Sequence, residues 1–190
     1  MRGVCDAVRE TASRFRDRIL HWDRRIVDAI GDSERMSRIE RLFMALTILG
    51  DGYIWAILGL GLLILGGTTD RLNVLIGTLV TVSNIGIFRV IKKHTARVRP
   101  ETDAAPRLRT RIDGFSFPSG HATTAFGLAW VVSNSYPSLG VRLSIYFVAA
   151  SIAISRVIVR EHYPLDILGG AMLGSAVAAA LYPLLTFLLF

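Results

Sequence analysis

Apolar and polar residues alternate along the chain in long blocks, and the apolar blocks predict helices that cross a membrane. A spanning helix needs roughly 20 mostly apolar residues. Five stretches of the 190-residue chain reach or approach this length: residues 46–67, 72–91, 122–136, 141–159 and 165–190. Only a few residues separate the first stretch from the second and the third from the fourth. Such short connections make adjacent helices antiparallel neighbours.

The first 40 residues follow a different pattern, in which apolar side chains recur every three or four positions among arginines and aspartates. This period predicts an amphipathic helix. The apolar positions are Val8, Ala12, Phe15, Ile19, Trp22, Ile26 and Ile30. Two placements remain open: the helix lies on the membrane surface, or its apolar stripe packs on the protein's own helices. We therefore expect an amphipathic interfacial arm over residues 1–40 and a transmembrane domain over residues 41–190.

Composition agrees with a membrane protein. Hydrophobic residues make up 52% of the chain and charged residues 19%, and the mean hydropathy is positive. Ordinary soluble domains are about 45–50% apolar and about 25% charged. The single Cys5 cannot form an internal disulfide. The expected fold class is all-α: an integral membrane helical bundle of about five transmembrane helices, preceded by the amphipathic helix.

Three polar clusters stand at the ends of the predicted spans. They are Lys92 with Arg99-Pro100, the run Pro118-Ser119-Gly120-His121, and Ser155-Arg156 with His162 and Asp166. The first follows the second span, the second opens the third span, and the last lies between the fourth and fifth spans. Antiparallel helices bring all of them to one face of the membrane. Ionisable groups that gather at the ends of spanning helices indicate a functional site.

The cations of these clusters are suited to binding a phosphate group. The guanidinium groups of Arg99 and Arg156 offer planar forks for phosphoryl oxygens, and the Lys92 ammonium adds a compact charge. Gly120 permits close approach of the backbone, and Ser119 adds a hydroxyl group at a helix N-terminus, where free amides favour an anion. The cations would repel a metal ion, so we expect neither a metal nor another cofactor.

Two histidines and a carboxylate supply the chemistry. His162 and Asp166 are four residues apart. If one helix includes both, the carboxylate accepts a hydrogen bond from one imidazole nitrogen and leaves the other free as a nucleophile. His121 then donates a proton to the departing oxygen. The same three residue types also occur in metal sites, a reading that the nearby cations disfavour.

The spacing of the three clusters resembles the tripartite signature of the type 2 phosphatidic acid phosphatase (PAP2) superfamily, the lipid phosphate phosphatases. Every signature position is filled, and the resemblance covers residues 46–190, including a Leu49-Gly50-Asp51-Gly52 run similar to one in bacterial members. It implies a PAP2/haloperoxidase-like core and a metal-independent phosphatase with a phosphohistidine intermediate. By this resemblance His162 is the nucleophile, Asp166 orients it and His121 is the general acid. The phosphate-binding residues it implies are Lys92, Arg99, Ser119, Gly120 and Arg156.

The substrate is expected to be a lipid phosphate, and nucleic acid is not an expected partner. Arg107, Arg109 and Arg111 alternate in the loop after the second span. They either meet a second phosphate or anchor lipid headgroups. We favour a polyprenyl (undecaprenyl) diphosphate, with phosphatidate, phosphatidylglycerophosphate and lipid A phosphates as alternatives. A lipid phosphotransferase, a vanadate haloperoxidase and a non-enzymatic membrane scaffold or transporter are the rival classes.

The expected location is a bacterial cytoplasmic (inner) membrane, crossed several times. Many family members have six spans, whereas five are predicted here, so the N-terminus falls on the active-site face. That face carries ten arginines in residues 1–41, while the opposite face has only Arg71 and Arg142. The positive-inside tendency then places the site in the cytoplasm. Bacterial relatives generally face outward, and both orientations remain open.

Overall fold

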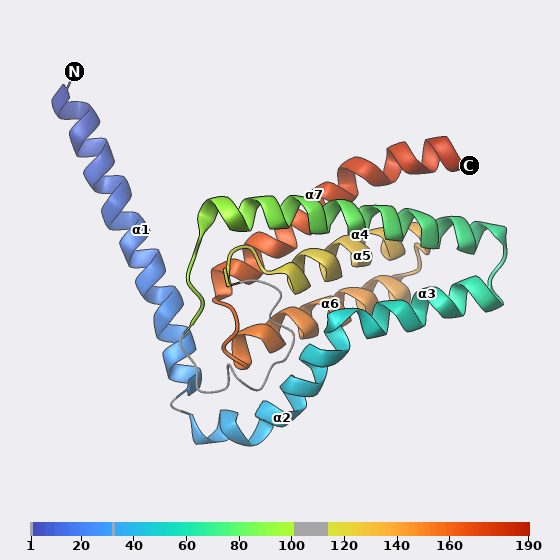
Figure 1. Cartoon of the computed structure of the whole chain (residues 1–190), viewed down its shortest axis with the longest axis horizontal. Coiled ribbons are helices and arrows are strands. Elements are labelled where there is room, and N and C mark those ends of the chain that lie inside the picture. Colours follow the sequence, from blue (N-terminus) through green and yellow to red (C-terminus); the bar gives the residue numbers. More distant parts are fainter. Residues whose placement is uncertain (1, 32, 101–113) are drawn as a thin grey trace.

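The computed structural model describes residues 2–31, 33–100 and 114–190, and within these ranges the chain is helical (Figure 1). The elements are α1 (Arg2–Gly31), α2 (Glu34–Ile48), a π-helical turn η1 (Leu49–Tyr53), α3 (Ile54–Leu65), α4 (Thr68–Thr95), α5 (Gly120–Ser135), α6 (Leu139–Ile158) and α7 (Pro164–Leu189). The predicted all-α class is confirmed.

Four helical segments of the described chain are long and apolar enough to cross a membrane: Arg41–Leu65, Thr68–Thr95, Leu139–Ile158 and Pro164–Leu189. They correspond to the first, second, fourth and fifth predicted spans. The third predicted span corresponds to α5, which has 16 residues. At 1.5 Å per residue α5 is about 24 Å long, shorter than the roughly 30 Å hydrocarbon core. A fifth crossing therefore stays a prediction.

Helix α5 lies at the centre of the bundle and packs against α4, α6 and α7 (Figure 1). Ala122, Ala125 and Ala129, which are spaced three and four residues apart, are completely buried. A helix surrounded by protein does not need a full apolar span, because its neighbours rather than lipid cover it.

The first predicted span is kinked rather than straight. Helix α2 ends at Ile48, the wide turn η1 follows, and α3 continues at an angle (Figure 1). Gly52 has a φ of 117° within this turn. Glycine adopts that conformation without the strain a side chain would add, and π-helical turns are a common cause of helix kinks. The kink directs Asp51 into the bundle, toward His121.

Helix α7 is held against α5 by two glycines four residues apart. A methyl group on Gly170 would lie 2.6 Å from the Ser119 carbonyl oxygen, and one on Gly174 would lie 2.0 Å from the Thr123 carbonyl oxygen. Small residues at this spacing let membrane helices approach closely. The contact fixes the N-terminal end of α7 beside the N-terminal end of α5.

Helix α1 contacts the bundle only near its C-terminal end, and its N-terminal half extends away from it (Figure 1). Val27 is buried against the other helices. The predicted surface location of this helix stays a prediction. The predicted division at residues 40 and 41 falls inside α2.

The α5–α7 contact makes Gly174→Ala destabilising, because the new methyl group overlaps a backbone carbonyl. We expect a loss of about 1–3 kcal/mol and a lower Tm for the purified protein in detergent. Gly86→Ala on α4 is the matched control, since nothing lies within 4 Å of its added methyl group. Equal Tm values for the two variants would contradict this packing.

Candidate active site

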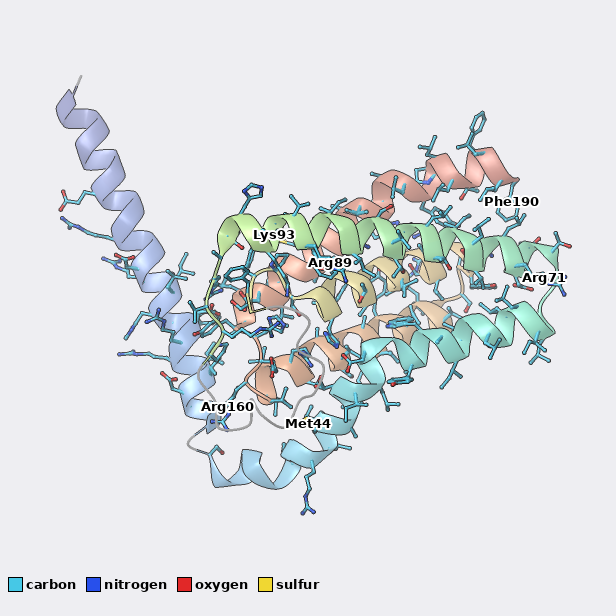
Figure 2. The ribbon with its side chains drawn as sticks, viewed as in Figure 1. Met44, Arg71, Arg89, Lys93, Arg160 and Phe190 are labelled. Atoms are coloured by element: carbon cyan, nitrogen blue, oxygen red, sulfur yellow. The ribbon has the colours of Figure 1, made fainter. Side chains whose placement is uncertain are left out.

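Four helix ends meet at one end of the bundle. The C-terminal ends of α4 and α6 supply Lys92 and Arg156, and the N-terminal ends of α5 and α7 supply His121 and Asp166. In Figure 2, Lys93 and Arg160 mark this end, while Arg71 and Phe190 mark the other. The structure thus brings together the three polar clusters that the sequence separates.

Two guanidinium groups converge on one carboxylate oxygen. Arg99 Nη1 donates to Glu161 Oε2 at 2.8 Å, and Arg156 Nη2 lies 4.0 Å from the same oxygen. Lys92 and Arg156 are both buried, as is Glu161. Two forks from different segments that reach one anionic oxygen have the geometry for a phosphoryl group. Glu161 was not among the predicted site residues.

The imidazole of His162 lies between this cation cluster and Asp166. Its Nε2 is 3.3 Å from Arg99 Nη1, and its Nδ1 is 3.5 Å from Asp166 Oδ2. Among the described residues Nδ1 has no hydrogen-bond partner. His162 lies in the turn before α7, so the assumption of one helix through both residues is wrong. The two side chains nevertheless face each other.

Burial lowers the pKa of His162 well below its usual value, and the nearby Arg156, Arg99 and Lys92 lower it further. A proton on this ring would add charge to a site already crowded with cations and shielded from water. The neutral imidazole is therefore favoured at neutral pH. A neutral ring has a lone pair available on one nitrogen, which a nucleophile requires.

Asp166 is fixed by three contacts at the start of α7. Its Oδ2 accepts from the Tyr163 amide at 2.9 Å, and its Oδ1 accepts from Arg97 Nη1 at 2.7 Å. Its backbone carbonyl accepts from the Ser119 amide at 3.0 Å. Arg97 was not predicted as a site residue.

His121 hydrogen-bonds through Nε2 to Asp51, which the kink at Gly52 brings into reach. The Asp51 carboxylate fixes the orientation of the ring. The Leu49-Gly50-Asp51-Gly52 run is part of the family resemblance, but the sequence alone predicts no role for Asp51.

Ser119 and Gly120 have local structural roles as well as a place in the site. The Ser119 hydroxyl caps α5 by accepting from the Ala122 amide at 3.5 Å. A methyl group on Gly120 would lie 3.0 Å from the Phe88 ring. The absence of a side chain at Gly120 therefore lets the backbone of α5 approach the Phe88 ring of α4.

Two of the residues missed by sequence reasoning, Arg97 and Glu161, carry charge close to a predicted site residue. Arg97 lies between Lys92 and Arg99, and Glu161 immediately precedes His162. Their closeness in sequence to predicted site residues is the signal that could have found them. It does not show which charged side chains point into the site. The alternating arginines Arg107, Arg109 and Arg111 lie outside the described residues.

A groove of about 1160 Å³ runs from the site along the helices, between α3, α4 and α5. Arg99, Arg156 and His162 line one end, and Asn73 and Tyr136 line the other. From Arg89 to Asn73 on α4 the distance is 16 residues, about 24 Å at 1.5 Å per residue. Its intermediate lining is largely apolar, with residues such as Leu62, Val74, Val82 and Leu128.

Comparisons with known proteins place this site in a family context. The sequence model of the PAP2 superfamily matches residues 72–188. The structure is similar to that of a transmembrane PAP2-type phosphatidylglycerolphosphate phosphatase from Bacillus subtilis, with 23% identity and a TM-score of 0.68 over 87% of this chain and 85% of that one. It is also similar to LpxE from Aquifex aeolicus, with 25% identity and a TM-score of 0.61 over 86% and 94%. No curated protein sequence gives a significant match.

Proposed function

The chain belongs to the PAP2 superfamily of membrane lipid phosphatases, and we propose that it removes phosphate from a lipid phosphate or diphosphate through a phosphohistidine on His162. The observation that carries this proposal is the position of His162 Nε2, 3.3 Å from Arg99 Nη1. A phosphoryl group bound by Arg99 would lie next to the lone pair of His162 Nε2. Positioning of this kind supplies much of the catalysis of phosphoryl transfer.

The first half of the proposed reaction transfers the phosphoryl group to the enzyme. Lys92, Arg99 and Arg156 neutralise the phosphoryl oxygens, with the amides at the start of α5 as further donors. His162 Nε2 forms a bond to phosphorus while the bond from phosphorus to the leaving oxygen breaks. His121 protonates that oxygen from Nδ1, because Asp51 engages its Nε2.

The second half returns the enzyme to its starting state. Water attacks the phosphorus, the nitrogen–phosphorus bond breaks, and His121 takes one proton from the water. Inorganic phosphate leaves, His121 is protonated again and His162 is neutral. If an alcohol replaced the water, the enzyme would be a phosphotransferase. No metal ion takes part in these steps, and metal independence stays a prediction.

The groove supports a substrate with a long apolar tail. A groove of about 1160 Å³ exceeds the roughly 300–1,000 Å³ typical of small-molecule sites. Arg89, which Figure 2 labels on α4, lines the groove, and it is three residues before Lys92 in the sequence. This additional cation favours a diphosphate, so a polyprenyl diphosphate is our first candidate. Phosphatidylglycerophosphate is the second, because the Bacillus subtilis relative is named for that activity.

The setting we propose is a bacterial inner membrane. The orientation of the site rests on the charge distribution of the sequence alone, and the cytoplasmic face stays a prediction. The orientation can be tested with Asp103→Cys, a position outside the described residues. Intact cells that carry this variant are treated with a membrane-impermeant thiol reagent. Ready reaction would place the site outside.

The hydrolase mechanism is tested by phosphate release from a panel of lipid phosphates and diphosphates. We expect His162→Ala to abolish release and His121→Ala to slow it by about 10²–10⁴-fold, because one loses the nucleophile and the other the general acid. EDTA should have no effect. His94→Ala is the matched control, since His94 is exposed at the end of α4. Full activity of His162→Ala would refute the mechanism.

The lipid tail is tested by filling the groove. Thr78 lines it, so Thr78→Trp should raise KM for a long-chain lipid diphosphate by about 10-fold through lost apolar burial. A short, soluble phosphate ester should be cleaved as before. Leu79→Trp is the matched control, because the adjacent Leu79 is exposed and lies outside the groove lining. Equal effects of Thr78→Trp on both substrates would argue against a tail in this groove.

A further inference from the structure

A carboxylate from the N-terminal arm reaches the catalytic end of the bundle. Asp23 of α1 is completely buried. Its Oδ1 accepts from the Leu165 amide at 3.0 Å in the first turn of α7, and its Oδ2 pairs with Arg97 Nη2. The neighbours Trp22 and Arg24 are exposed, whereas Val27, one turn further along α1, is buried like Asp23. Asp23 therefore lies on the face of α1 that contacts the bundle.

Arg97 connects Asp23 to Asp166. Its Nη2 pairs with Asp23, and its Nη1 donates to Asp166 Oδ1 at 2.7 Å. The guanidinium carbon lies 4.3 Å from the centre of the Tyr163 ring, so the planar group is stacked as well as paired. The Arg97 backbone carbonyl accepts from the Ser116 amide at 2.8 Å. One guanidinium therefore joins three parts of the chain at a defined position.

The sharing of Arg97 decides how Asp166 presents its oxygens. Asp23 holds Nη2, and Nη1 donates to Asp166 Oδ1. Asp166 Oδ2 is left to the Tyr163 amide and faces His162 Nδ1 at 3.5 Å. Without Asp23, the Arg97 fork could bind both Asp166 oxygens, the arrangement that guanidinium and carboxylate groups prefer. Oδ2 would then turn away from His162.

We propose that Asp23 is a positioning residue of the active site, which acts through Arg97 and Asp166 on the imidazole of His162. Helix α1 is then part of the catalytic assembly and not only a membrane anchor. The inference rests on the proposed function for its kinetic consequence, while the chain of contacts is independent of the reaction. The rival explanation is that Asp23 only docks α1 to the bundle.

The test compares Asp23→Asn with Asp28→Asn in the full-length protein, because Asp28 lies on the same helix and is exposed. Asp23→Asn should lower kcat by about 10- to 100-fold, the range known for groups that orient the ligands of catalytic metals through a hydrogen bond. KM should change less than about 2-fold, because Asp23 does not line the groove. Asp23→Glu should recover part of the loss, and Asp28→Asn should match the wild type.

A double-mutant cycle identifies the route. In an Arg97→Gln background Asp23→Asn should cause no further loss, because the residue through which it acts is gone. Rates are expressed per folded molecule, so a simple loss of folded protein leaves them unchanged. An unchanged kcat for Asp23→Asn, an effect confined to KM, or additive losses in the cycle would overturn the proposal.

A readout without substrate separates this inference from the proposed function. In ¹⁵N-histidine-labelled protein, Asp23→Asn should shift the His162 resonances, assigned from their loss in His162→Ala, and Asp28→Asn should not. If the wild type released no phosphate from any lipid but this shift were seen, the function would fail and the contact chain would stand. If the His162 resonances did not shift in Asp23→Asn, the inference would be overturned even if the enzyme were active.

Discussion

The constraint on which the rest of this structure depends is the burial of several cations at one end of a helix bundle. Charged groups removed from water need partners, or their desolvation outweighs any gain from folding. The chain meets this requirement with carboxylates from separate segments. Arg97 lies between Asp23 and Asp166, and Arg99 pairs with Glu161. These pairs tie α1, α7 and the segment after α4 together.

The same pairing determines the charge of the site. The site contains three positive charges, on Lys92, Arg99 and Arg156. The carboxylate of Glu161 lies close to both Arg99 and Arg156 and offsets one of these charges. A phosphoryl group that binds Arg99 and Arg156 must share these cations with the Glu161 carboxylate or displace it. Burial lowers the pKa of His162, and the nearby positive charges lower it further, so the cations that bind the phosphate also help keep the nucleophile neutral. The same cations thus serve both phosphate binding and the activation of His162.

Helix packing gives this arrangement its precision. Gly170 and Gly174 allow α7 to lie against the backbone of α5, and the Ser119 amide bonds to the carbonyl of Asp166 across that contact. The kink at Gly52 supplies Asp51 to His121. The groove between α3, α4 and α5 opens on the same cations. A lipid tail in this groove would present its headgroup to His162 without leaving the apolar region.

The sequence predicted the features that depend on local composition. Long apolar runs and short connections were enough for the helices, their antiparallel order and the meeting of the polar clusters at one end. Features that depend on tertiary contact were missed. Arg97 and Arg99 are two residues apart and alike in sequence, yet one joins the arm to Asp166 and the other faces His162. Asp23 is a charged residue at the edge of the apolar stripe of a periodic helix, four residues after Ile19 and three before Ile26. Only its contact with α7 reveals its burial.

The most direct test of the central claim is to trap the covalent intermediate. The purified enzyme is mixed with a lipid phosphate or diphosphate, quenched in alkali, where phosphohistidine survives, and analysed by mass spectrometry of its peptides. The account predicts a phosphoryl group on His162 in the wild-type enzyme and none in His162→Ala. A phosphoryl group on another residue, or turnover with no phosphorylated peptide, would contradict it.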